Sequence, residues 1–257
     1  MVKGTITITY GENVENHVGN QQIGAEIQNG ISSKRLKEIY NEMVGKGYSC
    51  EFINITSLLD AKTRNSTNEP IAAHILIVRD FVNTYFKEDI DKKLYTKLSK
   101  LNWDTHARMY GRVVNKHARY NLCFADFAQE PNYEIGNGRV YDFNSCGIPE
   151  LAKIRKFFEK LLCDGTSLNA EGNYYYDSTK CYIGYHGDTE RKIVAGVRFG
   201  ESFSLSYQWY HCSESISEPL TLQLQSGDMY IMSEKATGND WKNRSKLTLR
   251  HAASPCE

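Results

Sequence analysis

The segment that says most about the fold of this chain is Cys181-Tyr182-Ile183-Gly184-Tyr185-His186-Gly187-Asp188-Thr189-Glu190. Its first half is rich in aromatic and β-branched residues, which is typical of a strand. Since positions i and i+2 of an extended strand project to the same face, His186 and Asp188 can bind one metal ion at the rim of a sheet. A third ligand from a distant strand would complete the two-histidine, one-carboxylate set that holds non-haem Fe(II) and leaves positions open for other ligands.

The composition favours a soluble protein inside the cell. The chain has 257 residues, and its 31 basic residues balance its 31 acidic ones, so any nucleic-acid contact needs a local basic patch. The seven cysteines are scattered without a Cys-x-x-Cys spacing, which is typical of free thiols in a reducing compartment. No apolar run approaches membrane-spanning length, and the first residues do not resemble a signal peptide. We therefore expect a cytoplasmic or nuclear protein that does not enter a membrane.

The N-terminal part predicts a small β-α-β unit over residues 1–59. Residues 5–10, Thr-Ile-Thr-Ile-Thr-Tyr, alternate and are rich in β-branched side chains, which predicts a strand. A helix is expected over residues 33–43 and a second strand over residues 50–55. Residues 60–70 are polar and rich in helix breakers, as expected of a linker. We therefore expect an N-terminal α/β unit over residues 1–70 and a main domain over residues 71–257.

The main domain is expected to contain helices followed by many short strands. A buried strand is predicted over residues 73–78, a helix over residues 84–101, and an amphipathic helix over residues 149–163 with Pro149 in its first turn. From residue 174 onward the pattern is mostly that of strands, at residues 193–199, 203–210, 220–224 and 229–232. This order favours an α+β fold, with an antiparallel sandwich or jelly-roll barrel and helices packed outside it.

From about residue 73 onward, the order of these signals resembles the AlkB family of 2-oxoglutarate- and Fe(II)-dependent dioxygenases. Residues 183–190, Ile-Gly-Tyr-His-Gly-Asp-Thr-Glu, are very similar to the family's Ile-Gly-x-His-x-Asp-x-Glu signature. Residues 173–177 resemble its Asn-x-Tyr strand, and residues 224–232 resemble its Gly-Asp strand. The resemblance implies a double-stranded β-helix, that is a jelly-roll barrel with supporting helices. It also implies an oxidoreductase that uses Fe(II), 2-oxoglutarate and O2.

The third metal ligand is expected to be His251. Two histidines follow Asp188, and His211 precedes the Gly227-Asp228 turn, too early for the distal ligand in this topology. The sequence His-Ala-Ala-Ser-Pro at residues 251–255 also looks like the distal histidine segment of prolyl-hydroxylase-type members of the wider superfamily.

A competing register aligns residues 244–250 with the family's closing Arg-x-Asn-Leu-Thr-x-Arg strand. It leaves no second histidine and puts Asn239, Asp240 or Asn243 in its place.

With His251 as the ligand, the chain stops before the usual strand that carries the 2-oxoglutarate-binding arginine. Arg198 is the candidate cation, because it interrupts an apolar strand and such a residue faces either solvent or a polar cavity. The resemblance implies that Tyr176 adds a hydrogen bond to the same carboxylate. Arg250 and Arg244 are the next candidates for the cation.

The substrate suggested by the resemblance is a nucleic-acid base, which the enzyme would hydroxylate or demethylate by oxidation. Arg112, Arg119 and Tyr120 belong to a basic run with interleaved tyrosines, which suits phosphate contact and base stacking in single-stranded DNA or RNA. A charged loop over the barrel would show the same pattern. Two alternatives stay open: a protein or peptide hydroxylase of the same superfamily, and a catalytically degenerate barrel that acts as a binding module.

Overall fold

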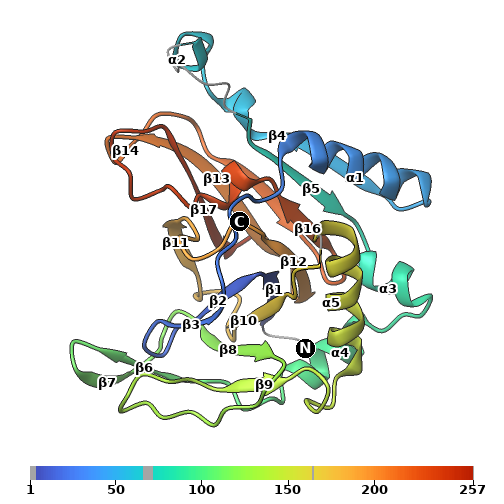
Figure 1. The fold of residues 1–257 in the computed structure, drawn as a ribbon, viewed down its shortest axis with the longest axis vertical. Coiled ribbons are helices and arrows are strands. Elements are labelled where there is room, and N and C mark those ends of the chain that lie inside the picture. The colour runs from blue at the N-terminus through green and yellow to red at the C-terminus, as the bar shows by residue number, and fades with distance from the viewer. Residues whose placement is uncertain (1–3, 66–71, 164, 257) are drawn as a thin grey trace.

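The computed structural model describes residues 4–65, 72–163 and 165–256, and its largest element is a curled sheet of eight strands (Figure 1). In spatial order the strands are β4 (Cys50–Asn54), β5 (His74–Val78), β16 (Met229–Met232), β12 (Ala195–Gly200), β1 (Thr5–Gly11), β10 (Asn169–Tyr175), β8 (Tyr120–Ala125) and β9 (Val140–Asp142). Neighbouring strands are antiparallel, except that β8 and β9 are parallel. The sheet forms about half of a barrel.

A second sheet lies against part of this main sheet. It contains β11 (Ile183–His186), β17 (Thr248–Pro255), β13 (Phe203–His211) and β14 (Glu214–Ser215), and β15 (Leu220–Leu224) also pairs with β13. Leu205 and Tyr207 of β13 share an apolar cluster with Ile75 and Ile77 of β5. The two sheets therefore bury a common core. Two hairpins, β2 (Asn13–Asn16) with β3 (Gln21–Gly24) and β6 (His106–Met109) with β7 (Arg112–Asn115), complete the strands.

The other face of the main sheet is covered by helices. They are α1 (Ser33–Gly45), α3 (Phe81–Phe86), α4 (Asp91–Leu98) and α5 (Pro149–Leu162), and their apolar side chains form one cluster with the strands. Shorter helices are the 3-10 turn η1 (Ile55–Leu58), α2 (Ala61–Asn65) and α6 (Glu234–Thr237). The amphipathic helix expected over residues 149–163 is confirmed as α5, since Leu151, Ile154 and Phe158 point into the core.

The alternation in β1 gives the sheet two chemically different faces. Ile6, Ile8 and Tyr10 belong to the cluster on the helix side. Thr7 and Thr9 project to the opposite side, where they line a cavity between the sheets. The threonine hydroxyls therefore contribute polar groups to the concave face, while the isoleucines stabilise the packing of the helices.

The helix expected over residues 84–101 is wrong in its extent. The chain forms two short helices, α3 and α4, and Lys87 between them adopts a left-handed conformation with φ 55°. The side chain of Asn83 accepts hydrogen bonds from the backbone N–H groups of Ile90 (2.9 Å) and Asp91 (3.1 Å). Asn83 therefore caps the start of α4, and a turn replaces the continuous helix.

The N-terminal residues differ from the expected separate β-α-β unit. β1 lies in the middle of the main sheet, between β10 and β12, and β4 pairs with β5. Local alternation predicts a strand but not its partners, which explains why the sequence suggested a boundary here. The linker expected over residues 60–70 contains α2 at Ala61–Asn65, and residues 66–71 lie outside the described residues.

The expected α+β class is confirmed, since the described chain is rich in sheet and has few helices. None of the helices in the described ranges is long and apolar enough to cross a membrane.

Candidate metal centre

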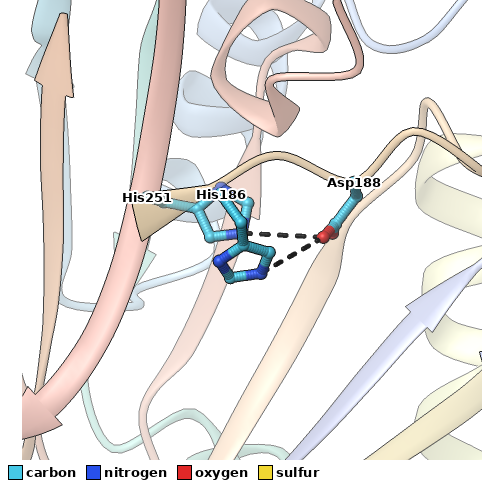
Figure 2. A group of neighbouring side chains, drawn as sticks. All are labelled: His186, Asp188 and His251. Atoms are coloured by element: carbon cyan, nitrogen blue, oxygen red, sulfur yellow. Dashed lines mark ion pairs between the residues drawn. The ribbon is translucent and has the colours of Figure 1, made fainter. Parts of the chain in front are cut away.

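Two antiparallel strands bring the three expected ligands together. His186 at the end of β11 and His251 in β17 are direct partners in the strand register, and Asp188 follows two residues after His186. The Oδ1 atom of Asp188 lies 3.7 Å from Nε2 of each histidine (Figure 2). Two ligands of one ion, each at about 2.1 Å, lie roughly 3–4 Å apart. His186, Asp188 and His251 therefore form a group that could hold a divalent metal ion.

The backbone around Gly187 explains how the aspartate reaches this position. A Cβ atom at Gly187 would lie 2.0 Å from the carbonyl oxygen of Gly238, which follows α6. The Asp188 N–H group donates a hydrogen bond of 3.0 Å to the carbonyl of Thr237. The segment between the two ligands therefore packs directly against the end of α6, and a side chain at Gly187 would displace it.

The charge states of His186 and Asp188 suit metal binding at neutral pH. Burial and the neighbouring His251 lower the pKa of His186 to about 4, so this imidazole is neutral. The Nδ1 atom of His186 lies 2.8 Å from the carbonyl oxygen of Gly184, which assigns the proton to Nδ1 and leaves Nε2 facing Asp188. Burial alone would raise the pKa of Asp188, but Arg191 and the histidines outweigh it and hold this pKa well below its usual range.

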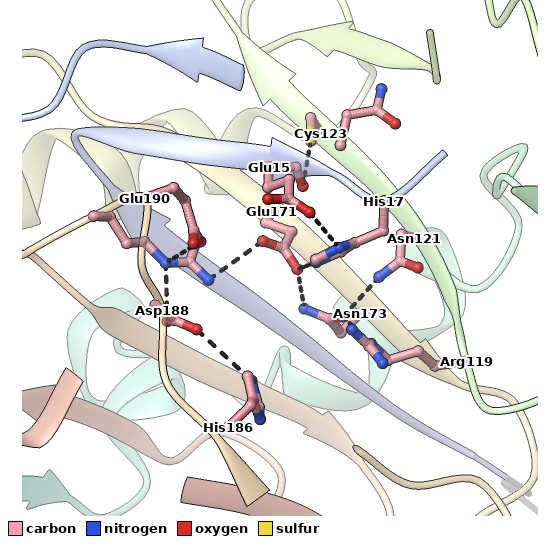
Figure 3. A network of polar contacts seen from close by, with 12 residues as sticks. Glu15, His17, Arg119, Asn121, Cys123, Glu171, Asn173, His186, Asp188 and Glu190 are labelled. Atoms are coloured by element: carbon pink, nitrogen blue, oxygen red, sulfur yellow. Dashed lines mark hydrogen bonds and ion pairs between the residues drawn. The ribbon is translucent and has the colours of Figure 1, made fainter. Parts of the chain in front are cut away.

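A buried polar network begins at the second oxygen of Asp188 (Figure 3). Arg191 donates a hydrogen bond of 2.9 Å from Nε to Asp188 Oδ2, and its Nη2 lies 3.3 Å from Oε2 of Glu171. The other oxygen of Glu171 lies 2.9 Å from Nε2 of His17, which comes from the turn between β2 and β3. One oxygen of Asp188 is thus fixed by a cation while the other faces the histidines.

Glu190 is a second carboxyl group beside this network. Its Oε1 atom lies 3.4 Å from Nε of Arg191, and its side chain is 11% exposed. Burial raises the pKa of Glu190 to about 7, with Asp188 and Glu171 adding to the effect and Arg191 opposing it. The carboxyl group of Glu190 therefore changes its charge near neutral pH.

The candidate ligands lie in a cavity with a volume of about 210 Å³. Besides the ligands, its wall contains residues from the concave faces of both sheets: Thr7, Thr9, Glu171, Asn173, Tyr175, Arg198, Leu205, Tyr230, Met232 and Ala253. Trp241 and Lys242, from the loop before β17, also line it. The wall is mixed in character, with hydroxyls, charges and apolar groups in contact with the same space.

Arg198 faces this cavity and not solvent. It is only 1% exposed, and its Nε and Nη1 atoms have no hydrogen-bond partner among the described residues. Burial lowers the pKa of Arg198. Thr7, its register partner on β1, has a buried hydroxyl that also lacks a partner there. Of the two orientations left open by the sequence, the structure has the inward one.

Tyr176 and Arg250, two residues expected to bind the cosubstrate, are not among the described residues that line the cavity. Tyr176 donates a hydrogen bond of 2.8 Å from its hydroxyl to the carbonyl of His117, and Tyr175 lines the cavity in its place. Adjacent residues of a strand project to opposite faces, so a shift by one residue exchanges these two rings. Arg250 packs its guanidinium over the rings of Tyr210 (4.1 Å) and Trp241 (5.3 Å).

The residues expected to contact nucleic acid lie in different environments. Arg112 is exposed in the β6–β7 hairpin, beside Tyr110, which is 99% exposed. Arg119 lines the cavity and donates a hydrogen bond of 2.6 Å to the side chain of Asn173. Tyr120 stacks on Tyr176, with ring centroids 4.3 Å apart. One ring face of Tyr120 is therefore already covered.

The competing register for the third ligand does not match the strand pairing. β17 begins at Thr248 and contains His251, whereas residues 244–247 precede it. Asp240 pairs with Lys235, with 2.7 Å between Asp240 Oδ2 and Lys235 Nζ. Asn243 accepts hydrogen bonds from Ser245 within a turn. The structure thus brings His251, and not these side chains, to His186 and Asp188.

Several residues of the site were missed by sequence reasoning. They are Arg191, Glu171, Asn173 and His17. A signal existed for Glu171, because it is a charged residue within a strand whose neighbours are small or aromatic, the same argument that identified Arg198. His17 carried no such signal, since its position depends on a hairpin packing across the sheet.

Comparison with known proteins gives one full-length relative and no named activity. No protein-family model matches this sequence. An uncharacterized protein of Acanthamoeba polyphaga mimivirus is 43% identical over 254 residues, covering 98% of this chain and 96% of the viral protein.

Proposed function

The chain belongs to the same family as this uncharacterized mimivirus protein, and we propose that it is an AlkB-like 2-oxoglutarate- and Fe(II)-dependent dioxygenase that oxidises a nucleic-acid base. The observation that carries the proposal is the group of two histidines and one aspartate in a cavity that also contains Arg198, whose buried Nε and Nη1 atoms have no hydrogen-bond partner in the described part of the chain. The curled main sheet and the smaller sheet beside it are compatible with a double-stranded β-helix, which is the fold we propose.

The donor set fits the proposed metal. Two imidazole nitrogens and one carboxylate oxygen, supplied from one side, leave coordination positions open, as in non-haem Fe(II) oxygenases and unlike closed structural zinc sites. His186, Asp188 and His251 would hold the ion. When bound, Fe(II) would supply the oxidation in which a substrate C–H bond, O2 and 2-oxoglutarate give a hydroxylated product, succinate and CO2.

Arg198 would bind the distal carboxylate of 2-oxoglutarate. A guanidinium attracts a carboxylate and donates hydrogen bonds to it, and the Nε and Nη1 atoms of Arg198, which point in different directions, have no hydrogen-bond partner among the described residues. The hydroxyl of Thr7, on the neighbouring strand, could donate a further bond. Leaving a guanidinium buried without an anion is costly, which supports an anionic ligand at this position.

The proposed substrate is a methylated base in single-stranded DNA or RNA. Support for this substrate comes from one basic and aromatic surface and not from the overall charge, because the chain as a whole has no net charge. The exposed β6–β7 hairpin presents Arg108, Arg112 and Tyr110, which suit phosphate contact and base stacking. Hydroxylation of an N-methyl group on the base would then release formaldehyde.

The test is turnover by the purified protein supplied with Fe(II), ascorbate and 2-oxoglutarate. Succinate and formaldehyde are measured with N-methylated single-stranded oligonucleotides, with wild type compared with His186→Ala. Formaldehyde formation that depends on His186 is the expected result. Succinate formation stimulated by peptides and not by oligonucleotides would favour the protein hydroxylase. Absence of 2-oxoglutarate turnover and of metal binding would contradict the enzyme and favour a binding module.

A further inference from the structure

Glu171 occupies a position that the proposed chemistry does not use. It lies on β10 and is 1% exposed, and one of its oxygens faces the guanidinium of Arg191 while the other faces the imidazole of His17. Oε2 lies 3.3 Å from Nη2 of Arg191, and Oε1 lies 2.9 Å from Nε2 of His17 (Figure 3). Asn173 donates a further hydrogen bond of 2.8 Å to Oε1. Burial would raise the pKa of Glu171, but His17 and Arg191 outweigh it and lower this pKa to about 2.

On one side, Glu171 contacts the residue that orients a candidate metal ligand. The Nε atom of Arg191 binds one oxygen of Asp188, which turns the other oxygen toward His186 and His251. A guanidinium can rotate about its bonds, so contact with Asp188 alone leaves its plane free. The Glu171 carboxylate forms an ion pair with Nη2, at 3.3 Å, and attracts that side of the guanidinium, which favours one orientation of its plane. Groups that orient metal ligands in this way affect metal affinity.

On the other side, Glu171 contacts the hairpin β2–β3. His17 lies in its turn, between Glu171 and Glu15, and Nδ1 of His17 is 3.2 Å from Oε1 of Glu15. The rest of the hairpin is held by a small apolar cluster that includes Val14 and Ile23. Glu15 and His17 line the cavity that contains the candidate metal ligands. The hairpin therefore forms part of the cavity wall.

We propose that Glu171 is a positioning residue that couples the candidate metal site to the β2–β3 hairpin. Glu171 holds Arg191 in contact with Asp188 and His17 in contact with the cavity wall. The ordered state of the hairpin and the orientation of Asp188 that binds a metal ion therefore stabilise each other. Such coupling is reciprocal: an ion bound at Asp188 stabilises the hairpin, and an ordered hairpin strengthens binding of the ion. The inference rests on the metal site of the proposed function.

The test combines Mn(II) affinity with hydrogen exchange in residues 13–24, measured on the whole protein with and without Mn(II). In the wild type, Mn(II) should slow exchange in the hairpin several-fold, because exchange reports local opening. Glu171→Gln keeps the shape but removes the charge. It should weaken Mn(II) binding by roughly tenfold or more, as loss of outer-shell partners does, and abolish the metal-dependent protection. His17→Gln should abolish that protection with a smaller loss of affinity.

Glu159→Gln is the matched control. Glu159 also pairs with a buried arginine, at 2.9 Å from Nε of Arg155, but it lies on α5. This variant should lose stability while keeping both Mn(II) affinity and the metal-dependent protection. If Glu171→Gln behaves like Glu159→Gln, its role is only structural and the coupling is wrong. Binding of Mn(II) by wild type without any change in the hairpin overturns the coupling alone, whereas absence of Mn(II) binding overturns the proposed function as well.

Discussion

His186 and His251 lie directly opposite each other on the antiparallel strands β11 and β17, with their ring centroids 4.5 Å apart. Each ring presents its Nε2 atom to the same oxygen of Asp188. The arrangement is set by backbone register, since a slip of one residue would turn His251 to the other face of its strand. The positions of both histidines at the candidate site therefore follow from that register.

Removing His251 should remove metal binding. His251→Ala deletes one of three ligands, so we expect Mn(II) affinity to fall by more than the roughly 10–100-fold that loss of an outer-shell partner costs. His211→Ala is the matched control, because His211 lies exposed at the end of β13. Calorimetric titration with Mn(II) measures both. A loss of affinity in Asp240→Ala but not in His251→Ala would restore the competing register.

Much of the candidate site could be predicted because it depends on local sequence. The spacing of His186 and Asp188 follows from strand geometry, and His251 was identified from its place after the Gly-Asp turn. The orientation of Arg198 needed the structure, since a charge in an apolar strand suits either solvent or a polar cavity. Tyr175 and not Tyr176 lines the cavity, because sequence does not fix which face of a strand meets the cavity.

The parts that could not be predicted depend on contacts between distant segments. The alternation of residues 5–10 predicts a strand, yet nothing in it shows that β1 is inserted between β10 and β12. The same insertion carries His17 to Glu171. Pairing partners of strands are set by the burial of whole faces, which a single sequence does not display.

Glu190 should make the protein less stable as pH rises from about 4.5 to about 7. Its pKa is raised to about 7 in the folded protein from an ordinary value of 4.5, mainly by burial. Between these two pKa values the folded state holds a proton that the unfolded chain has released. The contribution of Glu190 to stability is therefore fully present below the pKa of the unfolded chain and is lost above the pKa of the folded protein. Urea unfolding with a chelator present measures this effect. The free energy of unfolding of Glu190→Gln should match that of wild type at pH 4 and exceed it at pH 8 by up to about 3 kcal/mol.

The control for this prediction is Glu218→Gln, because Glu218 is exposed. Its stability should follow the wild-type pH profile. Other groups, including His186, also titrate between pH 4 and 7, so the informative quantity is the difference between variant and wild type at each pH. Parallel profiles for Glu190→Gln and wild type would show that Glu190 titrates normally.

Replacing Arg198 should separate cosubstrate binding from stability. Arg198→Met removes a buried cation whose Nε and Nη1 atoms lack a hydrogen-bond partner among the described residues, so we expect equal or higher stability together with a large loss of 2-oxoglutarate affinity. Arg198→Lys should keep part of the 2-oxoglutarate affinity, since the lysine ammonium retains the positive charge but lacks the planar set of N–H donors of the guanidinium. Mn(II) affinity should not change. Calorimetry on the Mn(II)-loaded protein measures 2-oxoglutarate binding, and thermal unfolding measures stability.

Arg250→Met is the comparison for Arg198. Arg250 packs over Tyr210 and Trp241 and is not among the described residues that line the cavity, so its loss should lower stability and leave 2-oxoglutarate affinity nearly unchanged. A large loss of cosubstrate affinity in Arg250→Met, with little change in Arg198→Met, would reverse the two assignments.

Arg112 and Arg119 should affect nucleic-acid binding in different ways. Arg112 is exposed on the β6–β7 hairpin, so Arg112→Glu should weaken binding of single-stranded oligonucleotides. It should also lower the salt dependence of binding. The slope of log binding constant against log salt concentration should fall by about 0.7 for each phosphate that the protein no longer neutralises. Arg119 lines the cavity and holds Asn173, which in turn binds Glu171. Arg119→Glu should therefore also weaken Mn(II) binding, which Arg112→Glu should leave unchanged.

Lys156→Glu, the same charge change on the exposed side of α5, controls for net charge. Fluorescence anisotropy across a salt series measures the slopes. Wild-type protein that binds no oligonucleotide at low salt would contradict the nucleic-acid substrate and favour a peptide, because binding to phosphates should be strongest under that condition.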